Sequence, residues 1–412
     1  MEASLMEMKK DEKQSACTVK PNFRGFSCCG NESNDAEDNL SFVGETVEER
    51  GLQHHSTVSE RGDEQKESSF SAIEEMSFLR QTLVDTAIGL RLFDSHCHLQ
   101  LPACYEEVNA LLQRAVDEGV IGLSICGTCP GMYSRSLLLI QFSVFTVVNL
   151  MTHFVTGEDW RRVERLCNER SSNRCLIVPH FGLHPWFISQ HLSTLTEHSY
   201  ATSNDVQYWE PELVRLLLAY PSAGVGECGL DKGIKREVST SQQVDILRRH
   251  IVIAAQYHRI LTLHCVRMYG TLLDTLTDYL QPNTTSDPIL LRPRAILLHS
   301  CNYLPAEMVS SFLSTLGDTE VYFSISAPPK TPSSKFVELL RSIPLDRLLI
   351  ETDSPDQLSY LFRGDSSNST RSINEPALIK YSCAQLARCL DLSPRELAEI
   401  TTSNALRLFC TN

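Results

Sequence analysis

The chain changes character near residue 88, where polar sequence gives way to short apolar runs that alternate with amphipathic stretches. Residues 1–70 are rich in Glu, Ser, Asn, Asp and Lys and contain few apolar runs. Such a composition buries too little apolar surface to offset the entropy lost on ordering. We therefore predict a disordered leader over residues 1–85 and a folded domain over residues 88–410.

Within the predicted domain, eight short β-branched or apolar runs predict buried strands, and amphipathic stretches of helical length separate or follow them. The strands are expected at 90–94, 120–126, 175–181, 223–227, 260–264, 295–300, 320–326 and 347–353. The helices are expected at 106–118, 160–169, 206–220, 242–258, 268–281, 305–315, 334–343, 373–390 and 393–408. Eight strand–helix units favour an α/β fold whose parallel sheet closes into a (β/α)8 TIM-type barrel.

The last predicted helix carries its own start signal. In "LSPRE", Ser393 is placed to cap the helix, Pro394 takes its first position, and Glu396 completes a capping box.

One apolar segment interrupts the alternation. "SLLLIQFSVFTVVNLMTHFV", residues 136–155, has about the length needed to cross a bilayer. Gln141, Asn149 and His153 break the run, and Arg135 is its single basic flank. Because "CGTCP" would join "GEDWRRVE" naturally without it, we favour an insertion over residues 131–156, placed between the second strand and its helix, and we predict no membrane partner.

The charge of the chain is unevenly spread. The net charge is -14, of which residues 1–85, with 9 Lys/Arg and 18 Asp/Glu, hold -9 and the remainder -5. The domain is thus mildly acidic, which argues against a broad basic surface that wraps nucleic acid. The start, "MEASLMEMKK", lacks the apolar core of a secretory signal, so the 15 cysteines are expected as free thiols in cytosol or nucleus.

Metal-binding side chains recur at the ends of the predicted strands. In a (β/α)8 barrel the C-terminal strand ends form one rim, so residues far apart in sequence converge there. The side chains in question are His96, His98, His184, Glu227, His264, His299 and Asp353. A lone histidine in a barrel is more often a hydrogen-bonded core residue, but the repetition of one topological position favours a metal centre.

Four histidines and two carboxylates suit a pair of divalent cations. We expect Glu227 to bridge both cations, with His96, His98 and Asp353 completing one site and His264 and His299 the other. Such a pair generates a nucleophilic hydroxide near neutral pH and stabilises both oxygens in phosphodiester cleavage. Asp353 would hold the water and take its proton.

Eight motifs in order carry a resemblance to a known family: "FDSHCHL", "FGLHP", "GECGLD", "LHC", "LLHS", "ETDSP", "NEP" and "TTSNALRLF". Together they resemble the TatD-type metal-dependent deoxyribonucleases, a branch of the amidohydrolase-like barrels. The resemblance runs from about residue 92 to 409. It implies two divalent metals and hydrolysis of DNA phosphodiester bonds, often from a 3′ end. It places the ligand roles on the same six residues and His184 near the scissile phosphate, so the catalytic set is Asp353, Glu227 and His184.

The sequence departs from the family in two places. Val266 stands where many members have an Arg directly after "HC", with Arg267 following, and "LLHSCNYLP" lacks the usual aromatic–Ser/Gly–Gly stretch. Both departures concern the substrate rim. The nitrogen-rich ligands favour Zn²⁺ or Mn²⁺, whereas a carboxylate bridge also suits abundant Mg²⁺.

Two other functions use the same residues. One is hydrolysis of a carbonyl, as in an aminoacyl-tRNA deacylase or a small-molecule amidohydrolase; Glu227 in place of a modified Lys after strand four favours the nuclease. The other is a non-catalytic scaffold, which has no need to keep all six ligands.

Three weaker signals remain. "GVGECG", residues 224–229, matches a dinucleotide-binding pattern by letter but lacks the following apolar helix. "CGTC", residues 126–129, has redox spacing without a thioredoxin-like frame. Trp186 is suited equally to stacking on a nucleobase and to packing under a loop.

Overall fold

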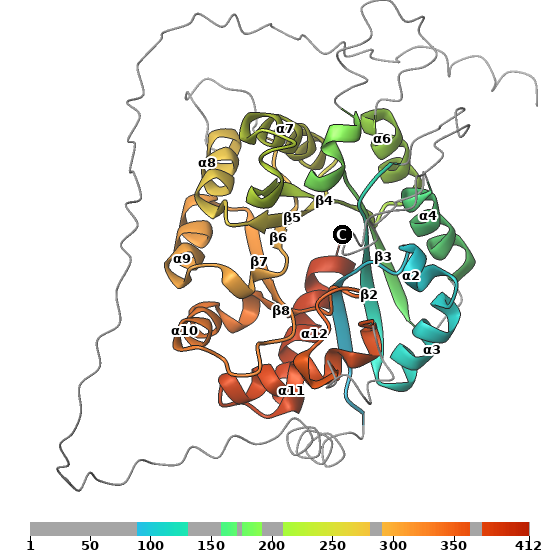
Figure 1. Ribbon diagram of the computed structural model, residues 1–412, viewed down its shortest axis with the longest axis vertical. Helices are drawn as coiled ribbons and strands as arrows, with labels where there is room; N and C mark the ends of the chain where they lie inside the picture. Colours follow the sequence, from blue (N-terminus) through green and yellow to red (C-terminus); the bar gives the residue numbers. More distant parts are fainter. Residues whose placement is uncertain are drawn as a thin grey trace, which may run out of the picture. The chain divides into compact units, whose positions relative to one another are not determined.

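A computed structural model shows the chain as an eight-stranded parallel barrel surrounded by helices (Figure 1). It describes residues 89–130, 158–170, 175–191, 209–280, 291–362 and 373–411. The predicted leader at 1–85 and the predicted insertion at 131–156 lie outside the described residues. The residues on either side of that insertion meet, because Asp159 Oδ1 accepts a hydrogen bond from Thr128 N at 2.8 Å.

The strands follow one another around the barrel in chain order, each parallel to the next. They are β1 Leu92–Cys97, β2 Val120–Gly127, β3 Leu176–Phe181, β4 Gly224–Asp231, β5 Ile260–Val266, β6 Ala295–Leu298, β7 Glu320–Ile325 and β8 Leu348–Ile350. All eight lie at predicted positions, so the predicted (β/α)8 architecture is confirmed.

The helices alternate with or follow the strands, and most of them cover the outside of the barrel (Figure 1). They are α2 Pro102–Tyr105, α3 Val108–Asp117, α4 Asp159–Arg170, α6 Trp209–Ala219, α7 Thr240–Gln256, α8 Tyr269–Leu280, α9 Ala306–Thr315, α10 Ser334–Ser342, α11 Ile379–Cys389 and α12 Pro394–Cys410. The predicted capping box of the last helix is present, with Ser393 accepting from Glu396 N and Glu396 accepting from Ser393 N.

The barrel closes between β1 and the residues after β8. Asp353 N donates to His96 O at 3.0 Å, and His98 N donates to Ser354 O at 2.7 Å. The buried carboxylate of Asp94 reinforces this seam by accepting from Thr352 N at 2.9 Å. Two segments separated by some 250 residues in sequence are therefore fixed side by side at the same end of the barrel.

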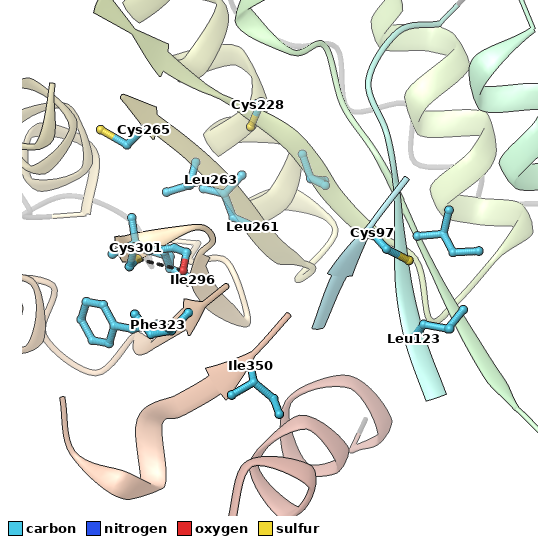
Figure 2. Packing of buried hydrophobic residues seen from close by; sticks show 14 of the residues in the cluster. Cys97, Leu123, Cys228, Leu261, Leu263, Cys265, Ile296, Cys301, Phe323 and Ile350 are labelled. Carbon is cyan, nitrogen blue, oxygen red and sulfur yellow. Dashed lines mark hydrogen bonds between the residues drawn. The ribbon is translucent and has the colours of Figure 1, made fainter. Parts of the chain in front are cut away.

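Apolar packing fills the barrel wall and one end of its interior. Strand neighbours face opposite sides, so Cys97, Cys228 and Cys265 are buried in the core between strands and helices (Figure 2). At the N-terminal end of the strands, α12 adds apolar side chains to the interior, and Phe409 stacks on Phe93 with ring centroids 5.2 Å apart. The open end is thus the C-terminal one.

Among the described residues, no helix is both long and apolar enough to cross a membrane.

Candidate metal centre

The structure brings all seven predicted side chains to the C-terminal end of the barrel, around Glu227. Six of them are buried, with exposed fractions from 0% for His96 to 8% for Asp353, and His264 is partly buried. In one respect the expectation was wrong: Glu227 and His264 lie inside β4 and β5, which continue to Asp231 and Val266. A register shift between Val225 and Cys228 interrupts regular pairing there and accompanies the inward placement of Glu227.

Glu227 touches two sets of histidines, one with each carboxylate oxygen. Its Oε2 lies 3.3 Å from His96 Nε2 and 3.2 Å from His98 Nε2. Its Oε1 lies 2.9 Å from His264 Nδ1 and 2.7 Å from His299 Nε2. Glu227 therefore lies between two sets of histidines, one facing each of its carboxylate oxygens.

Asp353 joins the first set. Its Oδ1 is 3.4 Å from His98 Nε2 and 3.7 Å from His96 Nε2. The ligand atoms of His96, His98 and Asp353 lie within 4.8 Å of one another, a spacing that one cation can span. His184, Glu227 and His264 form a second group of the same kind, and His96, His299 and Glu351 a third.

The hydrogen bonds behind the histidines indicate which nitrogen faces the centre. His98 Nδ1 lies 2.7 Å from the carbonyl oxygen of Cys126, which only accepts, so Nδ1 carries the proton. In neutral His98 the Nε2 lone pair then faces the oxygens of Glu227 and Asp353. Lone pairs opposed at this distance repel unless a cation or a proton lies between them. The donor set therefore fits a bound divalent cation.

His184 has the opposite tautomer from His98. Trp186 N donates to His184 Nδ1 at 3.2 Å, so in the neutral ring the proton is on Nε2, which lies 3.3 Å from Glu227 Oε1. Burial, together with the neighbouring His264, lowers the pKa of His184 to about 4, against a weaker opposing effect of Glu227. The ring is thus a neutral hydrogen-bond donor at pH 7, aimed into the centre.

The acidic and basic groups of the cluster shift one another's pKa values. Burial acts to raise the pKa of Glu227, but His299, His184 and His96 outweigh it and hold that pKa well below its usual range. The same competition, led by the hydrogen bond from His98, keeps the pKa of Asp353 low. Both carboxylates are therefore ionised. In return, burial of His299 is outweighed by Glu227, and the pKa of His299 lies well above its ordinary value.

A known family accounts for almost all of this domain. The sequence profile described as TatD related DNase matches residues 93–410.

The chain belongs to the TatD related DNase family.

Named relatives of this TatD-family chain include nucleases. It is 29% identical over 220 residues to the 3'-5' ssDNA/RNA exonuclease TatD of Rahnella sp., covering 50% of this chain and 73% of that protein. It is 25% identical over 331 residues to the putative deoxyribonuclease TATDN3 of Mus musculus, covering 78% and 89%. Membership places the chain among hydrolases.

Solved structures agree on the fold. The TatD homologue YJJV from Escherichia coli superposes with a TM-score of 0.56 at 20% identity, over 79% of this chain and all of that one. A TatD family hydrolase from Entamoeba histolytica gives 0.55 at 16% identity, over 79% and 99%.

Sequence reasoning missed four side chains that support the centre. Asp231 Oδ2 is 3.4 Å from His264 Nε2, and Glu351 Oε1 is 3.7 Å from His299 Nδ1. Cys126 Sγ is 3.3 Å from His96 Nδ1, and Gln357 donates its side-chain amide to Asp353. Asp231 and Glu351 lie within the "GECGLD" and "ETDSP" motifs, and an acid two or four residues from a predicted ligand was the available signal.

The weaker signals resolve as follows. The 224–229 stretch lies in β4 and carries Glu227 into the centre, so it makes no dinucleotide loop. Cys126 and Cys129 are both buried. Trp186 is 47% exposed. The two departures from the family lie on exposed parts of the rim, where Val266 is 37% and Tyr303 87% exposed.

Proposed function

We propose that this protein is a metal-dependent deoxyribonuclease that hydrolyses DNA phosphodiester bonds from the 3′ end, with two divalent cations held between the two ligand sets. The observation that carries the proposal is Glu227, whose two oxygens face separate groups of histidines. The relatives named 3'-5' ssDNA/RNA exonucleases support the substrate and the direction.

Each residue has a distinct part in the proposal. His96, His98, Asp353 and Glu227 would hold one cation, and His264, His299 and Glu227 the other. When bound, the cations supply positive charge against the phosphate and lower the pKa of a coordinated water. Mg²⁺ is proposed as the working metal on availability, with Mn²⁺ or Zn²⁺ as the ions that the four imidazoles favour.

The chain's own groups supply proton transfer and orientation. The low pKa of Asp353 leaves it ionised, so it can accept a proton from the attacking water. Gln357 holds one of its oxygens, which leaves Oδ1 facing the centre. His184 offers Nε2–H to a phosphate oxygen, because its lowered pKa keeps it neutral and Trp186 N occupies its other nitrogen.

The test is hydrolysis of a single-stranded oligonucleotide labelled at its 5′ end, compared with the same strand labelled at its 3′ end. Parent protein treated with EDTA should be inactive and should recover with Mg²⁺ or Mn²⁺. Glu227→Ala and Asp353→Ala should each lower kcat by at least about 10²-fold. A 5′ label should move through a ladder of shortening strands, while a 3′ label is released at once as a mononucleotide.

Two results would overturn the proposal. One is equal DNA degradation by the parent and both variants. The other is metal-dependent hydrolysis of aminoacyl esters by a parent protein that leaves DNA intact.

A further inference from the structure

An aromatic ring lies half exposed beside the metal centre. Trp186 belongs to the short turn η1 Pro185–Phe187, which follows β3 on the same rim as the candidate ligands. The indole is 47% exposed. Its ring packs edge-on against the imidazole of His184, with centroids 5.1 Å apart and an interplanar angle of 85°. A partly exposed hydrophobic surface thus lies next to the position proposed for the phosphate.

The ring is fixed from two directions. Trp186 Nε1 donates to Asp231 Oδ2 at 2.7 Å, and the backbone N of the same residue donates to His184 Nδ1 at 3.2 Å. Asp231 is itself anchored at the end of β4, where its Oδ1 accepts from Gly233 N at 2.6 Å and its Oδ2 lies 3.4 Å from His264 Nε2. The indole plane is therefore set before any substrate binds, and it is set by residues that contact the centre.

Two basic side chains lie on the same part of the rim as Trp186. Lys232 follows β4 directly, and Arg267 follows β5; both are exposed. The part of the chain that the structure describes offers neither of them an ion-pair partner. Since the protein carries a net charge of -14, unpaired positive charge beside the centre is a local feature that suits an anionic ligand. Strands β3, β4 and β5 are neighbours in the barrel (Figure 1), so the aromatic and basic positions form one continuous arc.

We propose that Trp186 stacks on the unpaired 3′-terminal nucleobase, next to the scissile phosphate. Lys232 and Arg267 would contact the next phosphates toward the 5′ end of the strand. The proposal rests on the nuclease function above and assigns the contact with the base at the reacting end to Trp186. A base inside a duplex has both faces covered by its neighbours, whereas a frayed or single-stranded base leaves one face for the indole. Stacking needs an aromatic face of any base, so little sequence preference is expected.

The experiment combines two changes: removal of the indole from the protein and removal of the base from the substrate. Parent, Trp186→Leu and Trp186→Phe are assayed on a single-stranded oligonucleotide and on the same strand with an abasic 3′-terminal nucleotide. On the intact strand, Trp186→Leu should raise KM roughly 5- to 150-fold with kcat little changed, and Trp186→Phe should restore most of the loss. On the abasic strand, the parent and Trp186→Leu should have the same KM.

A structural role for Trp186 would give a different pattern. It would change KM or kcat by the same factor on both strands, and that result would overturn the proposal. Metal content and unfolding midpoint are measured for each variant, so that loss of fold is recognised. Phe in place of Trp keeps an aromatic face without the bond to Asp231, and failure of Trp186→Phe to recover binding on a folded, metal-loaded protein would also contradict stacking.

The contacts proposed for Lys232 and Arg267 are tested by the salt dependence of KM. Lys232→Ala and Arg267→Ala should raise KM on both strands alike and should each reduce the salt dependence of log KM by about one unit of slope. Arg91→Ala is the matched control, because Arg91 is exposed at the opposite end of β1. Equal salt slopes for all three variants and the parent would remove Lys232 and Arg267 from the proposal.

Stacking can also be tested if the protein shows no nuclease activity. If the parent cleaves neither strand, the quenching of tryptophan fluorescence by the intact oligonucleotide still tests stacking, because Trp160 and Trp209 are buried and Trp186 is exposed. Saturable quenching in the parent that is absent in Trp186→Leu supports a nucleic-acid-binding ring. Absence of quenching in the parent overturns it.

Discussion

His299 lies between two carboxylates, one facing each nitrogen of its ring. Its Nε2 is 2.7 Å from Glu227 Oε1, and its Nδ1 is 3.7 Å from Glu351 Oε1. Glu351 Oε1 also accepts from Ser300 N at 2.7 Å, where the backbone turns through a left-handed φ of 51°. Glu351, which is fully buried, therefore holds the backbone beside His299 by a hydrogen bond and places a carboxylate next to the imidazole.

We expect Glu351→Gln to weaken metal binding by about 10- to 100-fold, because a neutral amide attracts and orients the imidazole N–H less strongly than a carboxylate. Calorimetric titration of metal-stripped protein with Mn²⁺ measures the affinity. Glu338→Gln is the control, since Glu338 is exposed on α10. Affinity in Glu351→Gln equal to that of the parent would show that Glu351 only fills space.

Proton release should accompany metal binding. For His98 and His299, burial is outweighed by Glu227 and by Asp353 or Glu351, so both pKa values lie well above the ordinary value. The metal-free rings therefore hold a second proton more strongly than an ordinary imidazole does. Since a cation needs that lone pair, binding displaces the proton, and affinity should rise with pH through the neutral range.

Calorimetry in two buffers of different ionisation enthalpy at one pH counts the protons released. The apparent binding enthalpy should differ between the buffers, and the affinity should increase about tenfold per pH unit for each proton displaced. Identical heats in both buffers, with an affinity that does not change between pH 6 and 8, would contradict the raised pKa values.

Single residues differ in how far the sequence identifies them. His96, His264 and His299 were found because each follows an apolar run, and a barrel brings such positions together. Asp231 and Glu351 were not, because the partner of a buried acid depends on which strand lies beside it. The tautomers of His98 and His184 depend on a carbonyl at Cys126 and a backbone N–H at Trp186, and neither appears in a residue pattern.

At the scale of elements, strand β4 places the shared carboxylate and depends on a glycine. Gly229 has a φ of +151°, and a Cβ added there would lie 1.9 Å from His264 O on β5. The close approach of β4 to β5 at this point is what brings Glu227 within 2.9 Å of His264. A side chain at residue 229 would push the two strands apart.

Gly229→Ala should therefore lower the free energy of unfolding by about 2 kcal/mol or more and should weaken metal binding in the protein that folds. Gly270→Ala is the matched control: it lies in α8 with no atom within 4 Å of an added Cβ, and it should be neutral or stabilising by up to about 1 kcal/mol. Urea unfolding compares the two. Equal stability of Gly229→Ala and the parent would show that β4 can move without cost.

Element positions followed well from periodicity and caps. Ser393, Pro394 and Glu396 fix the start of α12 by local chemistry alone, so that boundary could be read from five residues. The end of β4 was placed too early, at Glu227, because glycines and a buried acid resemble a strand terminus. The register shift that lets the strand continue arises from pairing with β5, which is a tertiary contact.

At the scale of the whole molecule, closure of the barrel makes the centre. The ligands come from five strand–helix units spread between His96 and Asp353, and the seam between β1 and the residues after β8 joins the first to the last. The number of strands, their parallel order and the open end were all predictable from the alternation of patterns. The seam itself was not, because it depends on Asp94 meeting Thr352 across the closed sheet.

If Glu227 is shared between two cations, the metal content of the protein should depend on this one carboxylate. Full-length protein is stripped, reloaded with Mn²⁺, dialysed and analysed by elemental mass spectrometry, for the parent, Glu227→Gln and His98→Asn. We expect about two ions per chain in the parent, about one in His98→Asn, and close to none in Glu227→Gln. A folded Glu227→Gln protein that keeps both ions would contradict this expectation.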